Sequence, residues 1–350
     1  MHVIKSDNAI IENQILKYLY LDSRISVSNL ANRLGLSYYI TSKYLANTIS
    51  KYDLFFTLDI NTDILGFSEA RILVIKFGKQ PETKILKKIL QKSEFIQDAY
   101  QASGEYDLIL FVVAKNAREY NNWQFEFRKQ LYQYIPEVYQ ATINVVEGFL
   151  PIQKSLIRFS NILDSREKSI LSILLQNSRI RLKDLCAKIG EPPMKVLYRI
   201  KQMQKRGIIL GFTTCIRQPS NSINIFYTVG ITPTYKHNPD LVLRLIDSIK
   251  SHDSIEKHVS NYSLVLDCAG SFDGAYFCSF EDNKALEDGP ILLKRIWAEE
   301  NPQVRQCILT SPLIGALPLN LNSYKKWSAE EVYLRKQLDI KNHRKGINIL

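Results

Sequence analysis

The sequence predicts an α+β fold class in which two three-helix units alternate with two βαββαβ units. Three features of the 350 residues predict this fold. The chain repeats itself, each repeat opens with three short stretches of helical apolar periodicity, and each continues with β-branched segments separated by amphipathic helices. A helical unit and a sheet-forming unit therefore occur twice, in the same order.

The repeat shows as residues that return at a constant offset. Ile15-Leu16 and Ser23-Arg24-Ile25 recur 155 residues later as Ile170-Leu171 and Ser178-Arg179-Ile180. Further along, Ser103 to Asp107 is echoed 166 residues later by Ala269 to Asp273. The second copy therefore carries an insertion of about eleven residues, which we expect between Asp240 and Asp267.

Each copy begins with three predicted helices. The second helices, 25–34 and 180–189, end at Gly35 and Gly190, where glycine permits the positive φ of a sharp turn. The third helices start after Ser37 and after Pro192-Pro193, and proline suits a first helical turn. This order predicts a helix-turn-helix. The inward stripes of the first helices are Ile11, Ile15, Leu16 and Leu19 in one copy and Ile170, Leu171, Leu174 and Leu175 in the other, the latter after Asp164 or Ser165 as N-cap.

Strand-like segments follow each helical unit. Leu54 to Ile60 and Ile208 to Ile216 are apolar and β-branched, and we expect each to form a wing hairpin. The next segments give a βαββαβ order, which is ferredoxin-like. In the first copy they are 70–77, 83–90, the hairpin 95–114, 119–134 and 138–146; in the second they are 224–231, 241–249, the hairpin 264–280, 291–299 and 304–310.

The predicted domains follow from these elements. Winged helix-turn-helix units occupy 9–60 and 163–216, and βαββαβ units occupy 66–148 and 222–312, with a linker at 149–162. Residues 313–350 form a basic tail with a short helix that starts at a capping box, Ser328 to Glu331. This tail is either solvated or an auxiliary phosphate contact.

Charge and composition narrow the class of function. A net charge of +11 and a pI near 9.2 favour a polyanionic partner, without separating DNA from RNA or an anionic membrane. Five cysteines without a Cys-x-x-Cys pair predict buried free thiols instead of a zinc site or disulfides. No segment suggests a signal peptide or a membrane span, so a cytoplasmic location is expected. Nucleotide-binding and hydrolase motifs are missing, and we predict no catalytic residue, metal or cofactor.

The order of these motifs resembles the Lrp/AsnC family of transcriptional regulators. The second copy has Arg199-Ile200 followed by Gly207 to Phe212, and both copies keep a Gly-x-aromatic-Asp turn, whereas Tyr44-Leu45 departs from the pattern. The resemblance, over residues 9–312, implies binding to double-stranded DNA and pairing through the βαββαβ units. Two copies in one chain would then form a built-in pseudo-dimer, for which a palindromic site is no longer required. A further homodimer or higher oligomer stays open.

The third helices are the candidate DNA-reading elements. In the second copy Val196, Ile200 and Met203 are expected to be buried. Residues 163–213 hold eleven basic and four acidic residues, a net +7, whereas residues 9–60 hold five and four, a net +1. The second copy is therefore expected to bind phosphates more strongly, and the first is either a DNA reader or a packing or partner-binding module. The candidate DNA-binding residues are Lys195, Tyr198, Arg199, Lys201 and Gln202, with Tyr38, Tyr39, Ser42 and Lys43; Thr41 lies among the latter.

The Gly-x-aromatic-Asp turns have two readings. As tight turns, they need glycine for positive φ, an aromatic ring to fill the core and aspartate to cap backbone amides. The family resemblance instead implies an effector site beside them, for an amino acid or a similar molecule. The two turns are not equivalent, because the first has Glu105 at the position where the second has Ser271. The candidate effector residues are Gly104, Tyr106, Asp107, Gly270, Phe272 and Asp273.

Two rival functions remain. Siroheme decarboxylases resemble this arrangement of paired winged helices and βαββαβ units, and the resemblance implies histidine and arginine near the central hairpin. This chain has His258 before Asn261-Tyr262 without a following arginine or second histidine, and Tyr100 to Ser103 in the first copy contains no histidine. The other rival is a regulator that acts mainly through protein contacts.

Overall fold

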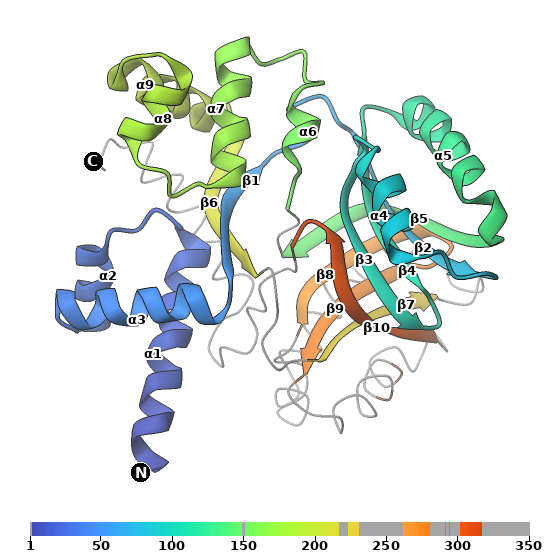
Figure 1. Ribbon diagram of the computed structural model, residues 1–350, viewed down its shortest axis with the longest axis horizontal. Coiled ribbons are helices and arrows are strands. Elements are labelled where there is room, and N and C mark those ends of the chain that lie inside the picture. Colours follow the sequence, from blue (N-terminus) through green and yellow to red (C-terminus); the bar gives the residue numbers. More distant parts are fainter. Residues whose placement is uncertain are drawn as a thin grey trace.

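The computed structural model describes residues 2–148, 151–216, 223–230, 262–280, 291, 294 and 302–316. Two three-helix units lie on one side of the molecule and a β-barrel on the other, as Figure 1 shows. In the part of the chain that is described, no helix has the length and apolar character needed to cross a membrane. The predicted helix 241–249, most of the predicted helix 291–299 and the tail beyond Ala316 fall outside the described residues. So does most of the range between Asp240 and Asp267 in which the insertion is expected, of which only 262–267 are described.

The first three-helix unit consists of α1 (His2–Leu21), α2 (Val27–Leu34) and α3 (Tyr38–Lys51). Serine side chains begin the last two helices: the Ser26 Oγ accepts the Asn29 N–H and the Ser37 Oγ accepts the Ile40 N–H. Gly35 follows α2 with φ +66°, as its place in the sequence predicted. The core of the unit includes Ile15, Leu16, Leu19, Leu30 and Leu45.

The second unit consists of α7 (Ser165–Gln176), α8 (Leu182–Ile189) and α9 (Pro193–Lys205). Of the two N-cap candidates the structure uses Asp164, which exchanges hydrogen bonds with Glu167 in a capping box. Gly190 ends α8 with φ +71°, so the chain reverses sharply before α9. The predicted stripe Ile170, Leu171, Leu174 and Leu175 is fully buried.

The expected wing hairpins are wrong. Strand β1 (Leu54–Ile60) and strand β6 (Ile209–Ile216) are single strands that pair antiparallel with each other, Thr57 opposite Thr213. The chain after Ile60 turns through Asn61 to Gly66 into the barrel and leaves no return strand beside β1. One edge of each strand is therefore paired with the other half of the chain, about 150 to 160 residues away.

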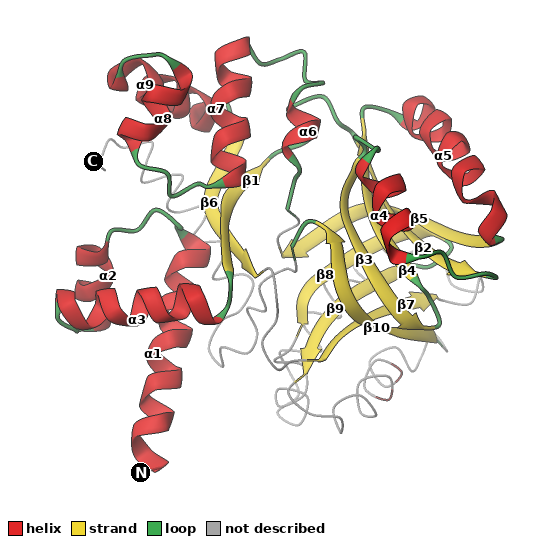
Figure 2. Ribbon diagram, in the orientation of Figure 1, coloured by secondary structure: helices red, strands yellow, loops and turns green. Residues whose placement is uncertain are grey.

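The barrel is a closed antiparallel sheet (Figure 2) in the order β10-β3-β4-β2-β5-β8-β9-β7. The halves meet where β10 pairs with β3 and where β5 pairs with β8. Aromatic rings fill the interior, among them Tyr100, Phe111, Phe226 and Phe277. The strands are β2 (Glu69–Phe77), β3 (Ile96–Gly104), β4 (Leu108–Ala114), β5 (Pro136–Gly148), β7 (Ile223–Gly230), β8 (Tyr262–Gly270), β9 (Gly274–Phe280) and β10 (Gln303–Ile314).

Two helices cover the first half of the barrel from outside. They are α4 (Thr83–Gln91) and α5 (Ala117–Leu131), the latter followed by a short 3-10 turn, η1 (Tyr132–Tyr134). Leu86, Leu90 and Phe127 pack from them onto the outer face of the sheet. The inner and outer faces of the strands thus belong to two separate cores, as the alternation of side chains along a strand requires.

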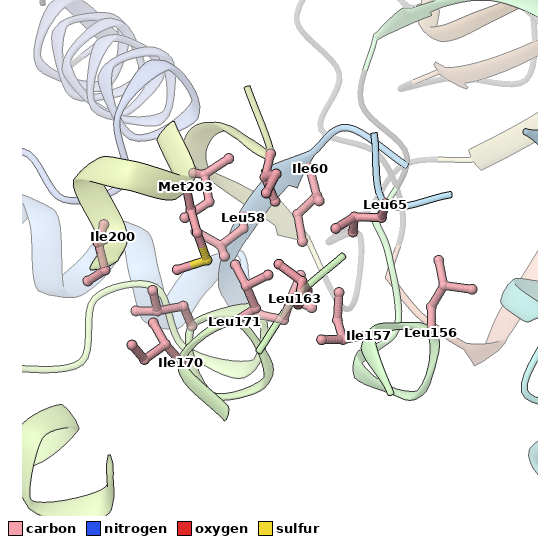
Figure 3. Close-up of a cluster of buried hydrophobic side chains, with 14 of the residues drawn as sticks. Leu58, Ile60, Leu65, Leu156, Ile157, Leu163, Ile170, Leu171, Ile200 and Met203 are labelled. Carbon is pink, nitrogen blue, oxygen red and sulfur yellow. The ribbon is translucent and has the colours of Figure 1, made fainter. Parts of the chain in front are cut away.

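The segment expected to be a linker is packed. Within it, α6 (Lys154–Ile157) buries Leu156 and Ile157 against Leu65 and the core of the second three-helix unit (Figure 3). The apolar residues within 149–162 were the feature of the sequence that could have predicted this packing. All five cysteines are unpaired and buried, which confirms the prediction of free thiols.

Asp98, near the start of β3, carries a fully buried carboxyl group. It lies against Gly315, where a Cβ atom would stand 1.6 Å from the Asp98 Oδ1, so the carboxyl group occupies space that only glycine leaves free. Tyr100 from the same strand donates its hydroxyl to the Ala316 carbonyl oxygen at 3.0 Å. Burial raises the pKa of Asp98 well above its ordinary value of 3.8.

Asp98→Asn is expected to raise the melting temperature at neutral pH and to flatten its dependence on pH. Because the pKa of Asp98 is higher in the folded chain than in the unfolded one, its contribution to stability is present below about pH 4 and is lost as pH rises through the folded pKa. Thermal unfolding between pH 4 and 9 measures this, with the exposed Asp63→Asn as control. Parallel curves for the wild type and Asp98→Asn would contradict the assignment.

Candidate nucleic-acid interface

Helix α9 divides its residues between the core and the solvent as predicted. Val196, Ile200 and Met203 are buried, which fixes the helix on α7 and α8. Lys195, Tyr198 and Lys201 are exposed and Gln202 is half-buried at the rim. The outer face of α9 therefore presents ammonium, hydroxyl and amide groups, the kinds of group that contact phosphates and base edges.

Arg199 differs from the other predicted residues of α9. Its guanidinium forms ion pairs with Asp164 at 2.6 Å and with Glu191 at 3.0 Å, and these two partners raise its pKa. Asp164 also caps α7, so Arg199 ties α9 to the start of α7. Its charge is therefore matched within the domain. The sequence separation of 35 residues between Arg199 and Asp164 gave no sign of this contact.

The first turn of helix α3 exposes apolar and hydroxyl groups, and its first exposed cation is Lys43. Tyr38 is 60% exposed, Tyr39 78% and Ile40 43%. Lys43 is exposed and Ser42 is half-buried, whereas Thr41 points inward and is fully buried. Ile40 was missed as a surface residue, although its place one turn before Lys43 on the helix put both on one face.

The two three-helix units are joined by contacts that recur with the partners exchanged. The Ser23 N–H donates to the Phe212 carbonyl oxygen at 2.9 Å, and the Ser178 N–H donates to that of Phe56 at 3.1 Å. Between them the two serine hydroxyls share a hydrogen bond of 2.6 Å. This reciprocal pattern is that of an isologous, two-fold interface.

Side chains extend the same pattern along β1 and β6. The Thr57 hydroxyl donates to the Leu175 carbonyl oxygen at 2.9 Å, and the Thr213 hydroxyl donates to that of Tyr20 at 2.8 Å.

Two arginines close the interface in the same reciprocal way. Arg24 lies over the Phe212 ring at 5.2 Å and Arg179 over the Phe56 ring at 5.4 Å. Burial lowers the pKa of both guanidinium groups. The contacts hold α3 and α9 in a fixed relation, on the side of the molecule away from the barrel (Figure 1).

The Gly-x-aromatic-Asp turns lie where the halves of the barrel meet. Gly104 has φ +127° and Gly270 has φ +153°, conformations that favour glycine. A Cβ on Gly270 would come within 2.5 Å of the Gln140 carbonyl oxygen, and one on Gly104 within 3.1 Å of that of Gln306. The Ser271 N–H donates to the Gln140 carbonyl oxygen at 2.8 Å, so the turn joins the two halves directly.

The other turn residues also have structural partners. Tyr106 is buried and shares a hydrogen bond of 2.9 Å with Thr228, and burial raises its pKa. The Asp107 carboxylate accepts the Phe77 N–H at 2.8 Å and lies 3.3 Å from the Lys76 ammonium. Phe272 is buried and Asp273 half-buried. Tight-turn geometry thus accounts for the glycines, the rings and Asp107.

Comparison with known proteins decides the nature of the second three-helix unit. Residues 163–209 match the family model described as winged helix-turn-helix DNA-binding. This unit is a helix-turn-helix DNA-binding domain, called the winged-helix domain below after the family description. Among the described strands, however, its β6 pairs with β1 and not with a second wing strand of its own. Its third helix is α9, so the exposed face of α9 lies on the element that enters the major groove in helix-turn-helix proteins.

The chain is also similar in sequence to several proteins named as transcriptional regulators. An "Uncharacterized HTH-type transcriptional regulator" of Pyrococcus furiosus is 25% identical over 124 residues, which are 35% of this chain and 76% of that protein. The leucine-responsive regulatory protein of Haemophilus influenzae is 26% identical over 106 residues, 30% of this chain and 63% of that protein. Each match spans about a third of the chain. The similarity is to DNA-binding regulators of the Lrp type.

Similarity to solved structures extends over nearly the whole length of the chain. The siroheme decarboxylase NirDL superimposes with a TM-score of 0.54 and 11% identity, covering 93% of this chain and 99% of that one. At this identity the likeness concerns the fold. The described residues contain one histidine, His2 at the start of α1, and His258 lies outside them.

Proposed function

We propose that this protein is a sequence-specific transcriptional regulator of the Lrp type, in which two fused copies of one unit supply a built-in pair of DNA-reading helices. The observation that carries the proposal is the reciprocal interface across β1 and β6, which holds the winged-helix domain of residues 163–209 against a second three-helix unit. Such pairing is what a regulator needs to reach two neighbouring half-sites.

The two reading helices have unlike tasks in this proposal. Lys195 and Lys201 on α9 contact phosphates, and Tyr198 and Gln202 reach base edges, while Arg199 positions the helix. On α3, Ser42 and Lys43 hold the backbone, and Tyr38 and Tyr39 contact bases, including thymine methyl groups. A site read by these two faces is not palindromic.

Replacing Tyr38 and Tyr39 together with alanine is expected to relax sequence selectivity at one half-site and to leave the salt dependence of binding unchanged. Both side chains are exposed and uncharged, so they release no counterions when they bind. Competition between duplexes altered in one half-site measures selectivity. Unchanged DNA binding with loss of a protein partner would instead support the alternative, that the first unit is a protein-binding module.

The direct test of DNA recognition compares the chain's own promoter fragment with an unrelated duplex of equal length at two salt concentrations. Specific binders exceed their non-specific affinity by roughly 10³ to 10⁷. We expect a preference of at least about a hundredfold, with affinity that falls steeply as salt rises. Equal, weak binding to both duplexes would reject the proposal.

We also propose that a small effector controls DNA binding. The Tyr106 hydroxyl, Thr228 and the half-buried Asp273 lie beside the two turns between the halves, and an amino acid or similar effector would bind there. Assembly into a homodimer or a higher oligomer is proposed together with it. The two turns are unequal, since Glu105 stands where the other has Ser271.

A siroheme-decarboxylase-like enzyme is the second candidate, because that fold covers 93% of the chain. Visible absorbance separates the two functions. A shifted siroheme or haem spectrum on mixing, without retardation of promoter DNA, would favour the enzyme. Retardation without a spectral change would favour the regulator.

A further inference from the structure

Helix α4 carries a basic face that lies apart from the winged-helix domain. Leu86 and Leu90 are buried on the outer face of the barrel. Lys84, Lys87 and Lys88 are exposed on the opposite face. Lys79 before the helix and Lys92 at its C-cap are exposed as well, and with the three lysines of α4 we call them the α4 lysine face.

The charge of the α4 lysine face is uncompensated. Residues 79–92 contain five lysines and a single acid, Glu82. Among the described residues none of the five lysines takes part in an ion pair. By contrast Lys115, just before α5, pairs with Glu119 of that helix at 3.8 Å. Lysines four positions apart repel each other and weaken a helix, and a bound polyanion removes that repulsion.

The spacing of the lysines suits a chain of phosphates. Lys84, Lys88 and Lys92 follow one ridge, and at a rise of 1.5 Å per residue they span about 12 Å along the helix. Duplex DNA carries one charge per roughly 1.7 Å of its axis, so several phosphates fall within this length. The lysines are flexible point charges without acceptors, which bind backbone and do not discriminate bases.

We propose that the α4 lysine face binds the phosphate backbone of DNA that flanks the site read by α3 and α9. Helix α4 lies against the outer face of the barrel, apart from α3 and α9 of the two three-helix units (Figure 1). It therefore contacts duplex beyond the half-sites, and the bound DNA bends toward the barrel. The inference rests on the proposed function, because that function supplies the DNA.

Binding to two duplex lengths tests the α4 lysine face. The variant K84Q/K87Q/K88Q keeps good helix-forming residues, and its melting temperature checks that it is folded. On a duplex limited to the selected half-sites it is expected to bind within about twofold of the wild type. On a duplex with long flanks, the affinity of the variant is expected to depend less steeply on salt than that of the wild type. The magnitude of the slope of log affinity against log salt decreases by roughly 0.9 per lost phosphate contact, about three in all.

A matched variant, R118Q/R128Q/K129Q on α5, removes the same charge from exposed positions of another barrel helix. Equal losses on the long duplex for the two variants would overturn the inference, as would equal losses by the α4 variant on both duplex lengths. Loss of binding to vesicles of anionic lipid, with long-duplex binding unchanged, would overturn it in favour of a membrane surface. If the wild type binds neither duplex, the proposed function fails together with it.

Discussion

Reversing the charge of Lys195 and Lys201 together is expected to lower affinity for the selected DNA site by roughly a hundredfold or more at moderate salt, because each substitution removes a cation from a phosphate contact and puts a repelling carboxylate in its place. Both ammonium groups are exposed on α9, on the outer face of the winged-helix domain. The slope of log affinity against log salt is expected to fall by about two. Fluorescence anisotropy on a short labelled duplex measures both quantities.

Two controls separate charge at the interface from charge elsewhere. Arg128→Glu with Lys129→Glu makes the same change of charge on α5 and is expected to leave short-duplex affinity nearly unchanged. Arg199→Gln breaks the contacts to Asp164 and Glu191. It is therefore expected to lower the melting temperature and to leave the salt dependence of DNA binding nearly unchanged. Equal loss of affinity in all three variants would show that α9 is not the reading helix.

Gly270→Ala is expected to destabilise the fold by about 3 kcal/mol or more, because backbone with positive φ costs about 1–2 kcal/mol and overpacking about 1–3 kcal/mol. The new methyl group would meet the Gln140 carbonyl oxygen at 2.5 Å and the Ala141 Cα at 2.8 Å, both on the strand from the other half of the chain. Urea unfolding measures the change in free energy.

Gly190→Ala is the matched control for this substitution. Gly190 also has positive φ, but no atom lies within 4 Å of the place that its new methyl group would take, so only the backbone cost of about 1–2 kcal/mol applies. Gly104→Ala, with its nearest contact at 3.1 Å, is expected to fall between the two. Equal free energies of unfolding for Gly270→Ala and Gly190→Ala would show that the barrel opens easily at this junction.

The features predicted well from the sequence are local ones. The apolar stripe Ile170 to Leu175 and the Asp164 cap follow from helical periodicity and from hydrogen bonds three residues apart. Gly35 and Gly190 were recognisable because a helix end with positive φ favours glycine. The spacing of Val196, Ile200 and Met203 predicted which face of α9 is buried, and therefore which face is exposed.

The features that were missed depend on residues far apart in the chain. An apolar strand such as Leu54–Ile60 does not show in its own residues whether its partner is the next segment or β6. The ion pairs of Arg199 join α9 to Asp164 in the same way, across three helices. The α4 lysine face was present in residues 79–92, but its meaning depended on knowing that Leu86 and Leu90 face the barrel.

The central claim is that one chain carries two unlike DNA-reading helices in a fixed relation. Selection of binding sites from a library of randomised duplexes tests it most directly. The account predicts an asymmetric site of two different half-sites, about one helical turn apart. The half-site read by α9 loses its sequence preference when Tyr198 and Gln202 are replaced with alanine. A palindromic site, or no enrichment of any sequence, would contradict the account.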